Sequence, residues 1–406
     1  MTNFMCGAST ASHQVEGANQ FSDWWEFEQS GRLPHRSGDA CRHLELYESD
    51  FDLARDLGHN AHRFSIEWSR IEPEEGTWDP GALQHYVRVI EALRARGIEP
   101  VVTLHHFSNP AWFTRAGGWA TGRSVELFRC FVEFVAPELT RHVRYFLTIN
   151  EPTVYVKRAY VSGDWPPCRA GAWLEGLAAM RNQCRAHVVA YDILHSVRPD
   201  VMVGFAHSAP CVQADSPGRW LDRGAAAMRD FVLNGLPFRL LGRRAETVLD
   251  FIGINYYTRQ RVRWRPGGPA ALLFGAEQKT SRDGEQRRFN SLGWEIYPRG
   301  LQVVLRRFAR YGLPLVVTEN GIATDDEQLR ERFVAEHLEA LDAARQEGLP
   351  VIGYFYWSLM DNYEWTEGYT AKFGLAGVDF ATQRRTVRPA GIRYRSYCLS
   401  DRPEAA

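Results

Sequence analysis

Eight short apolar segments, separated by longer polar and helical stretches, constrain the fold more than any other feature of this sequence. They are rich in β-branched and aromatic residues, and runs of this length and composition predict buried strands. In chain order they read "FMCGAS", "AHRFSIEW", "PVVTLHHF", "RYFLTINE", "VMVGFAHS", "DFIGINYY", "LPLVVTEN" and "VIGYFYWS".

Amphipathic helical patterns lie between these segments, over residues 44–58, 82–97, 123–142 and 329–348. Their apolar residues recur at spacings of three and four, and several of them stop at a glycine. Eight strands that alternate with helices predict an α/β fold, a single (β/α)₈ TIM barrel over residues 1–406. We expect elaborated βα loops, because 406 residues exceed a typical barrel by roughly 150.

The charge pattern excludes several classes of partner. The net charge is −1 and the basic residues are scattered, so neither a nucleic-acid surface nor an anionic-membrane surface is expected. No apolar run reaches about 18 residues, and the first residues lack the pattern of a signal peptide. The sequence is compatible with a homo-oligomer but does not specify one.

Seven cysteines are spread widely along the chain. Their number is odd, no CxxC motif occurs, and no Cys/His cluster has zinc-like spacing. We therefore expect reduced thiols, a cytoplasmic location and no metal site.

Two of the predicted strands run directly into a glutamate. "RYFLTINE" ends at Glu151 and is followed by Pro152, which cannot continue a strand ladder, while "LPLVVTEN" contains Glu319. In a parallel barrel both carboxylates would lie on the rim that carries active sites. Paired carboxylates suggest glycoside hydrolysis, and in a retaining enzyme the carboxyl groups lie about 5–5.5 Å apart.

Other polar strand-end residues would support these carboxylates. Arg63 would hold Glu319 ionised, Tyr257 would donate to it, and Asn150 would bind a sugar 2-hydroxyl. Each residue alone is more often structural, but polar groups at the ends of most strands are hard to explain by packing. Aromatic residues make up 13% of the chain, which suits the stacking of sugar rings as well as core packing.

Longer motifs extend this interpretation over nearly the whole chain. The sequence resembles glycoside hydrolase family 1, the retaining β-glucosidase/β-galactosidase family. The matching segments occur in family order: "GASTASHQVEG", "LGHNAHRFSIEWSRIEP", "GIEPVVTLHHFSNPAWFTRAGGW", "TINEP", "FIGINYYT", "LGWEIYP", "VVTENGIA" and "YFYWSLMDNYEWTEGYTAKFGLAGVDF".

The resemblance implies a role for each matching position. Glu151 matches the acid/base and Glu319 the nucleophile, and the family needs no metal or organic cofactor. Residues implied to bind the sugar are Gln14, His106, Asn150, Glu364 and Trp365, with Trp357 as the platform under the ring and Phe373 near its 6-position. Arg63, Asn255 and Tyr257 match supporting residues, and Trp294 matches a residue on the aglycone side.

The expected activity is removal of a terminal non-reducing β-D-glucosyl, galactosyl or fucosyl unit from a small glycoside or oligosaccharide. Phe107 and Ser108 replace a Trp and an Asp that are common in the family, which affects the expected aglycone preference rather than the reaction.

Alternatives are a 6-phospho-β-glycosidase, a preferential transglycosidase and a catalytically inactive sugar-binding protein. The first usually carries a serine at the position of Trp365, and a thioglucosidase would carry Gln at the position of Glu151.

Overall fold

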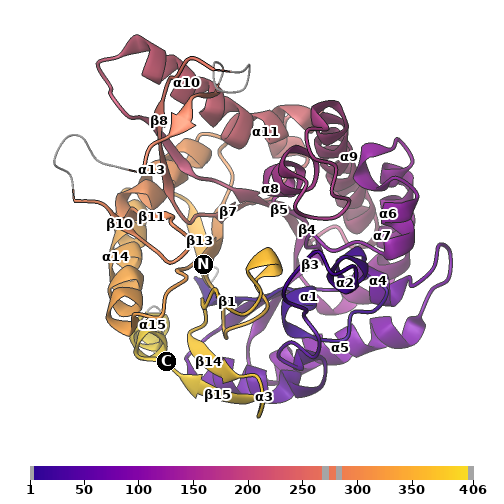
Figure 1. Cartoon of the computed structure of the whole chain (residues 1–406). Helices are drawn as coiled ribbons and strands as arrows, with labels where there is room; N and C mark the ends of the chain where they lie inside the picture. Colours follow the sequence, from indigo (N-terminus) through magenta and orange to yellow (C-terminus); the bar gives the residue numbers. More distant parts are fainter. Residues whose placement is uncertain (1–3, 268–273, 280–285, 401–406) are drawn as a thin grey trace.

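The computed structural model describes residues 4–267, 274–279 and 286–400. Eight parallel strands close into a barrel in the order β1-β13-β12-β7-β5-β4-β3-β2. Figure 1 shows these strands at the centre with the helices around them. The predicted (β/α)₈ barrel with elaborated loops is confirmed.

All eight barrel strands fall within the predicted apolar segments or extend them by one residue. Their bounds are β1 Met5–Ser9, β2 Ala61–Ser65, β3 Glu99–His105, β4 Tyr145–Asn150, β5 Met202–Ser208, β7 Ile252–Asn255, β12 Leu315–Asn320 and β13 Val351–Trp357.

The helices that cover the barrel include the four predicted from amphipathic patterns, here α3, α5, α7 and α14. The main helices are α3 His43–Asp56, α5 Pro80–Ala95, α7 Ser124–His142, α9 Trp173–Val197, α10 Trp220–Asp230, α11 Leu236–Leu240, α13 Pro298–Ala309, α14 Glu327–Gln346 and α15 Pro389–Ser400. Shorter helices in the loops are α1 Ser12–Val15, α2 Asp23–Gln29, α4 Trp68–Ile71, α6 Ala111–Arg115 and α8 Pro152–Val156, which runs into a π-helical turn over Lys157–Ser162.

Local sequence signals explain where these helices begin and end. Asp79 caps α5 by accepting hydrogen bonds from the backbone of Gly81 and Ala82, and Pro80 occupies the first helical position. Asp326 caps α14 in the same way. Gly97 follows α5 with a φ of 69°, a conformation that glycine adopts without steric strain.

The interior of the barrel is packed with side chains rather than open. Met5, Ala61, Val101, Tyr145, Leu147, Ala206, Phe251, Val316 and Phe355 form this inner cluster. Because strand side chains alternate between the two faces, the residue two positions further along a strand also faces inward. Ala61 is thus followed by Arg63, and Phe355 by Trp357, one layer nearer the carboxyl ends of the strands.

Irregular pairing interrupts this alternation next to the two predicted catalytic glutamates. The register between β4 and β5 shifts between Leu147 and Asn150, and the register between β12 and β7 shifts between Val317 and Glu319. Such irregularities re-aim side chains at the rim of a barrel.

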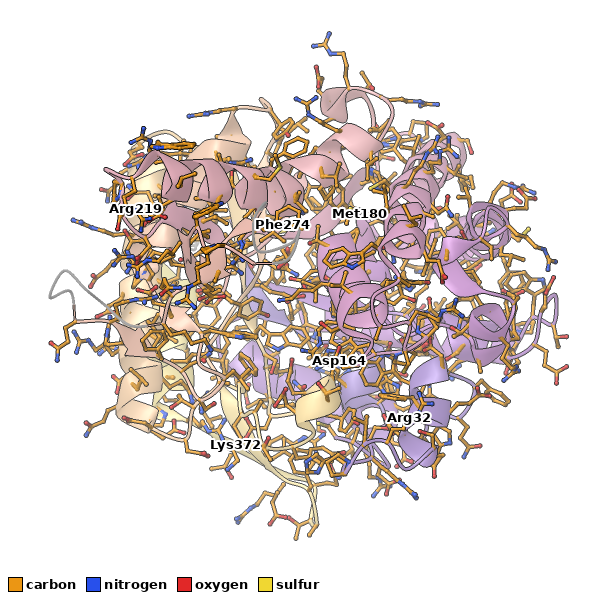
Figure 2. All side chains as sticks on the ribbon, turned by 45° about the horizontal axis from the view of Figure 1, so that its top comes forward. Arg32, Asp164, Met180, Arg219, Phe274 and Lys372 are labelled. Atoms are coloured by element: carbon orange, nitrogen blue, oxygen red, sulfur yellow. A yellow bond between two sulfur atoms is a disulfide. The ribbon has the colours of Figure 1, made fainter. Side chains whose placement is uncertain are left out.

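The additions lie in loops beyond the carboxyl ends of the strands. A small sheet of β6 (Cys211–Ala214), β8 (Arg259–Arg263), β9 (Ala276–Glu277), β10 (Arg288–Phe289) and β11 (Glu295–Ile296) is separate from the barrel sheet, as is the hairpin of β14 (Ala376–Asp379) and β15 (Arg384–Val387). Arg32 of the β1 loop and Asp164 of the β4 loop line one surface cavity of about 500 Å³, and both are labelled in Figure 2.

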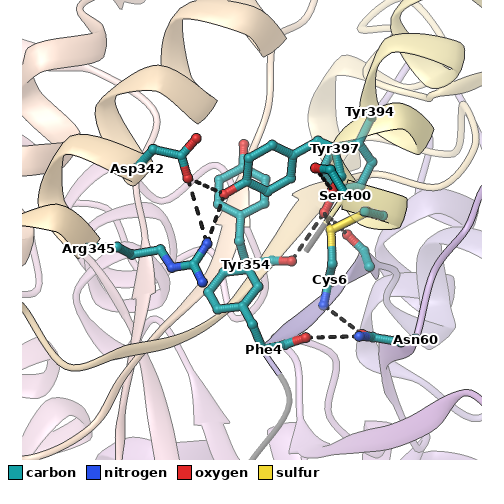
Figure 3. The surroundings of a disulfide bond; sticks show 11 residues. Phe4, Cys6, Asn60, Asp342, Arg345, Tyr354, Tyr394, Tyr397 and Ser400 are labelled. Atoms are coloured by element: carbon teal, nitrogen blue, oxygen red, sulfur yellow. Dashed lines mark hydrogen bonds and ion pairs between the residues drawn. A yellow bond between two sulfur atoms is a disulfide. The ribbon is translucent and has the colours of Figure 1, made fainter. Parts of the chain in front are cut away.

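A disulfide bond corrects the expectation that all cysteines are reduced. Cys6 of β1 is bonded to Cys398 of α15, with their Cα atoms 5.5 Å apart (Figure 3). The same helix is also held to the barrel by Tyr394, whose hydroxyl donates to the carbonyl of Gly7 at 2.7 Å. The pairing was not predictable from spacing, since 392 positions separate the two cysteines. The other five cysteines are free thiols.

Candidate active site

The two predicted catalytic glutamates lie at the carboxyl ends of β4 and β12. Glu151 directly follows β4 in a left-handed conformation with a φ of 44°, and Pro152 then starts α8. Glu319 is the fifth residue of β12, and both glutamates are buried. The turn at Glu151 takes the chain out of the sheet at the position where the sequence predicted it to leave.

Asn255, at the end of β7, connects the two carboxyl groups. Its Nδ2 donates to Oε1 of Glu151 at 3.0 Å and to Oδ1 of Asn150 at 3.1 Å, and the same Oδ1 accepts from Arg63, the cationic partner of Glu319. Thr318 donates to Oδ1 of Asn255 at 2.6 Å, which orients the amide so that its NH₂ group faces Glu151. The two glutamates therefore belong to one hydrogen-bonded site.

Arg63, on β2, is the cation of this site. Its Nη1 lies 2.6 Å from Oε1 of Glu319, and its Nη2 lies 2.7 Å from Oδ1 of Asn150. Its Nε donates to the Thr103 hydroxyl at 3.1 Å, and the side chain is fully buried. A guanidinium held by this many fixed partners presents its charge to Glu319 in one geometry.

The environments of the two carboxyl groups differ. Burial and the charge of Glu319 raise the pKa of Glu151 to about 8. Burial also raises the pKa of Glu319, but the Arg63 guanidinium and the Tyr257 hydroxyl, 2.7 Å from Oε2, act in the opposite direction. Since Glu319 has the cation as a direct partner, we assign the proton shared by the pair near neutral pH to Glu151.

The residues predicted to bind sugar hydroxyls lie around this pair. Nε2 of Gln14 donates to Oε2 of Glu364 at 3.0 Å. Burial and the charge of Glu319 raise the pKa of Glu364 to about 8. His106 lies 3.2 Å from Nδ2 of Asn150 through its Nε2.

Aromatic rings form two walls of the site. The His106 ring is stacked on Trp357 at 5.8 Å between centroids and on Trp365 at 6.4 Å. On the other wall Tyr257, Trp294 and Phe373 lie within 5.4–6.3 Å of one another. The structure thus brings all thirteen predicted site residues together around the strand ends; their individual roles stay predictions.

A model of one protein family matches almost the entire chain, over residues 1–236 and 242–401. Its description is glycosyl hydrolase family 1. The chain belongs to glycosyl hydrolase family 1.

Several family 1 relatives align over nearly their full length. Beta-glucosidase A of Thermotoga maritima is 31% identical over 96% of each chain, and beta-glucosidase of Agrobacterium sp. is 33% identical over 97% of this chain and 94% of its own. A 6-phospho-beta-galactosidase of Lacticaseibacillus casei is 30% identical over 97% of each. Among solved structures, a beta-glycosidase from Pyrococcus horikoshii is 38% identical, with a TM-score of 0.89 over 98% of this chain and 94% of its own.

Family 1 membership and these β-glucosidase relatives identify the chain as an O-glycoside hydrolase acting on β-glycosides. Within the described residues, no three His, Cys, Asp or Glu side chains group in a way that would hold a metal ion. No helix in the described part of the chain is long and apolar enough to cross a membrane.

Apart from Phe107, the sequence did not single out the residues that pack behind the family 1 site. Trp365 is packed against Trp24 at 4.7 Å and Trp165 at 5.5 Å, and Phe107 lies at 5.4 Å from it. Thr103 and Thr318, which orient Arg63 and Asn255, were also not predicted from the sequence to belong to the site. Threonine is common in strands for packing reasons alone, so only the position of Thr318 directly before Glu319 could have indicated its role.

Proposed function

We propose that the chain is an exo-acting retaining β-glycosidase that works by double displacement. The observation that carries this proposal is the pair of buried carboxyl groups linked through Asn255, Asn150 and Arg63: the guanidinium of Arg63 bonds to Glu319 directly, whereas the neutral amide of Asn255 donates to Glu151. This asymmetry suits a nucleophile and an acid, because the nucleophile must be ionised and the acid protonated.

In the first step a carboxylate oxygen of Glu319 forms a bond to the anomeric carbon as the bond to the leaving oxygen breaks. Glu151 gives its proton to that oxygen, and the aglycone leaves as an alcohol. In the second step Glu151, now ionised, takes a proton from water as the water oxygen displaces Glu319. The sugar departs with its original β configuration, and both carboxyl groups return to their starting states.

We further propose that Gln14, His106, Asn150, Glu364 and Trp365 bind the hydroxyls of the terminal sugar over Trp357. Trp294 would line the aglycone side. The preferred substrates would be small β-D-glucosides, galactosides or fucosides. A panel of nitrophenyl glycosides that differ only in the sugar tests this, and hydrolysis of none of these three would contradict it.

Stereochemistry and covalent trapping test the mechanism. Proton NMR of the first product should show the β anomer, and an activated 2-deoxy-2-fluoro-β-glycoside should add its sugar mass to the peptide that contains Glu319. The α anomer as first product would contradict a retaining mechanism. If the protein neither hydrolyses the β-glycoside substrate nor forms an adduct with the fluoro-glycoside, an inactive sugar-binding protein would be favoured.

The relatives named 6-phospho-beta-galactosidase give a second candidate activity. Trp365 speaks against it, because this bulky residue is 5% exposed and packed among rings where such enzymes usually carry a serine. Comparing kcat/KM for nitrophenyl β-galactoside with and without a 6-phosphate decides between them. Product analysis at high acceptor concentration measures the transglycosidase alternative.

We also propose that residues 1–406 act as one catalytic domain, since the barrel closes by pairing β1 with β13. A cytoplasmic location stays a prediction. The Cys6–Cys398 disulfide argues against the part of that prediction that relied on reduced thiols, because disulfides persist mainly in oxidising compartments.

A further inference from the structure

His13 lies directly before Gln14 in α1, but no role was predicted for it from the sequence. Its ring is stacked on the Trp365 indole, with 5.6 Å between centroids and 6° between planes. Both residues are buried. The contact joins the loop after β1 to the loop after β13, at a residue that we propose binds the terminal sugar.

The backbone of Trp365 has a conformation that needs support from its surroundings. Its φ is 51°, in the left-handed region that a bulky residue rarely adopts. Such a conformation persists where the neighbouring structure holds it in place. Gln14 holds the chain just before it, since its carbonyl accepts from the backbone N–H of Tyr363 at 3.1 Å and its Nε2 donates to the Tyr363 carbonyl at 2.9 Å. From the same helix, the ring of His13 reaches the indole itself.

Hydrogen bonds at both nitrogens fix the His13 ring. Nε2 lies 2.9 Å from Oε1 of Glu28, and Nδ1 lies 3.0 Å from Nδ2 of Asn19. Glu28 is itself held, because its Oε2 accepts from the backbone N–H and the hydroxyl of Ser37 at 2.8 and 2.7 Å. The side chains of His13 and Glu28 are both fully buried. The imidazole therefore cannot turn away from the Trp365 indole without leaving buried polar groups unpaired, which is costly.

We propose that His13 is a positioning residue for Trp365, whose fixed ring holds the indole in the orientation that binds the terminal sugar. This inference rests on the proposed function, in which Trp365 contacts a sugar hydroxyl. A rotation of the indole would move its N–H away from the sugar, and a misplacement of about 1 Å can cost as much as about 10²-fold in rate.

Two substitutions separate the ring of His13 from its hydrogen bond to Glu28. His13→Gln removes the ring but keeps an amide donor, and should lower kcat/KM for nitrophenyl β-glucoside by roughly 5- to 30-fold. His13→Phe keeps a flat ring but removes the donor, so it should lose more Tm yet stay within about 3-fold of the unaltered kcat/KM. Activity should thus follow the ring, whereas a purely structural role predicts that activity follows Tm. A loss in His13→Phe as large as that in His13→Gln would refute the proposal.

A double-mutant cycle shows whether His13 acts through Trp365. Trp365→Leu, which has no flat ring to orient, should itself lower kcat/KM by roughly 10-fold or more. Adding His13→Gln to Trp365→Leu should change kcat/KM by less than about 2-fold, because residues that act through one another are not additive. Losses that multiply would overturn the proposal. His337→Gln is the matched control, since His337 is also buried and stacked on a ring, that of Phe333 in α14, and it should leave kcat/KM unchanged.

The same variants distinguish failure of this inference from failure of the proposed function. No hydrolysis by the unaltered protein, or full activity of Trp365→Leu, would refute the proposed sugar site and the role of His13 with it. A loss in Trp365→Leu together with full activity in His13→Gln would refute the role of His13 alone. If His13→Gln does not fold, His13→Leu, which fills the space without a flat ring, is measured in its place. It should show the same loss of kcat/KM, and normal activity would again refute the proposal.

Discussion

Arg63 and Glu319 form a buried ion pair, with Nη1 2.6 Å from Oε1 and side chains that are 0% and 5% exposed. Charges this well shielded from water interact strongly, and removing one partner leaves the other uncompensated. The pair connects β2 to β12, two strands that are separated in the barrel by β1 and β13.

Arg63→Met should lower kcat/KM by about 10²- to 10³-fold. The acidic limb of the pH profile should move to higher pH, because Glu319 loses the cation that favours its ionised form. Arg330→Met is the matched control: Arg330 is equally buried but donates to the carbonyls of Ile322 and Lys372. It should lower Tm without moving the acidic limb. If Arg63→Met has a lower Tm but an unchanged acidic limb, Arg63 does not act by keeping Glu319 ionised.

Glu319→Gln should reduce hydrolysis of every aryl β-glycoside by about 10⁴-fold or more, because an amide cannot form the glycosyl-enzyme bond. Steady-state rates measure the remaining activity, and circular dichroism shows whether the variant is still folded. Glu295→Gln changes another buried glutamate, one paired with Arg259 and Arg287, and should retain most activity. Near-normal turnover by Glu319→Gln would remove Glu319 from the mechanism.

Glu151→Gln should abolish the alkaline limb of kcat/KM for a substrate with a good leaving group. The pKa of Glu151 is raised to about 8, so its proton is present below that pH and lost above it. Activity of the unaltered protein should therefore fall as the pH rises through about 8. An alkaline limb that persists in Glu151→Gln would assign the acid to another group.

Cys398→Ser should lower Tm by about 2–6 °C, the effect of losing roughly 2–5 kcal/mol in a chain of this length. Scanning calorimetry with and without reductant is the measurement. Reductant should lower Tm of the unaltered protein and leave that of Cys398→Ser unchanged. Cys130→Ser removes a free thiol and should still respond to reductant. A protein indifferent to reductant would contradict the disulfide.

The strands and the site residues were predictable for a common reason. Each barrel strand is a short apolar run, and a polar group at its end stands out against that background, as Glu151 does after Tyr145–Asn150. The matching motifs then added Gln14 and Glu364, which come from loops and carry no strand signal of their own.

What could not be predicted depends on contacts between distant elements. The register irregularities beside Asn150 and Glu319 arise from pairing with neighbouring strands, which leaves no local mark in the sequence. The Cys6–Cys398 bond depends on α15 returning to lie against β1. Thr318 acts through Asn255, so its role appears only once β7 and β12 are adjacent.

The disulfide between β1 and α15 lies near the amino ends of the barrel strands, whereas the two catalytic carboxyl groups lie at their carboxyl ends. The cross-link that should stabilise the fold and the residues that should carry the reaction thus lie at opposite ends of one barrel. Substitutions at Cys6 could therefore change thermal stability without altering the catalytic residues, and substitutions at the carboxyl ends of the strands could change leaving-group preference without breaking the disulfide.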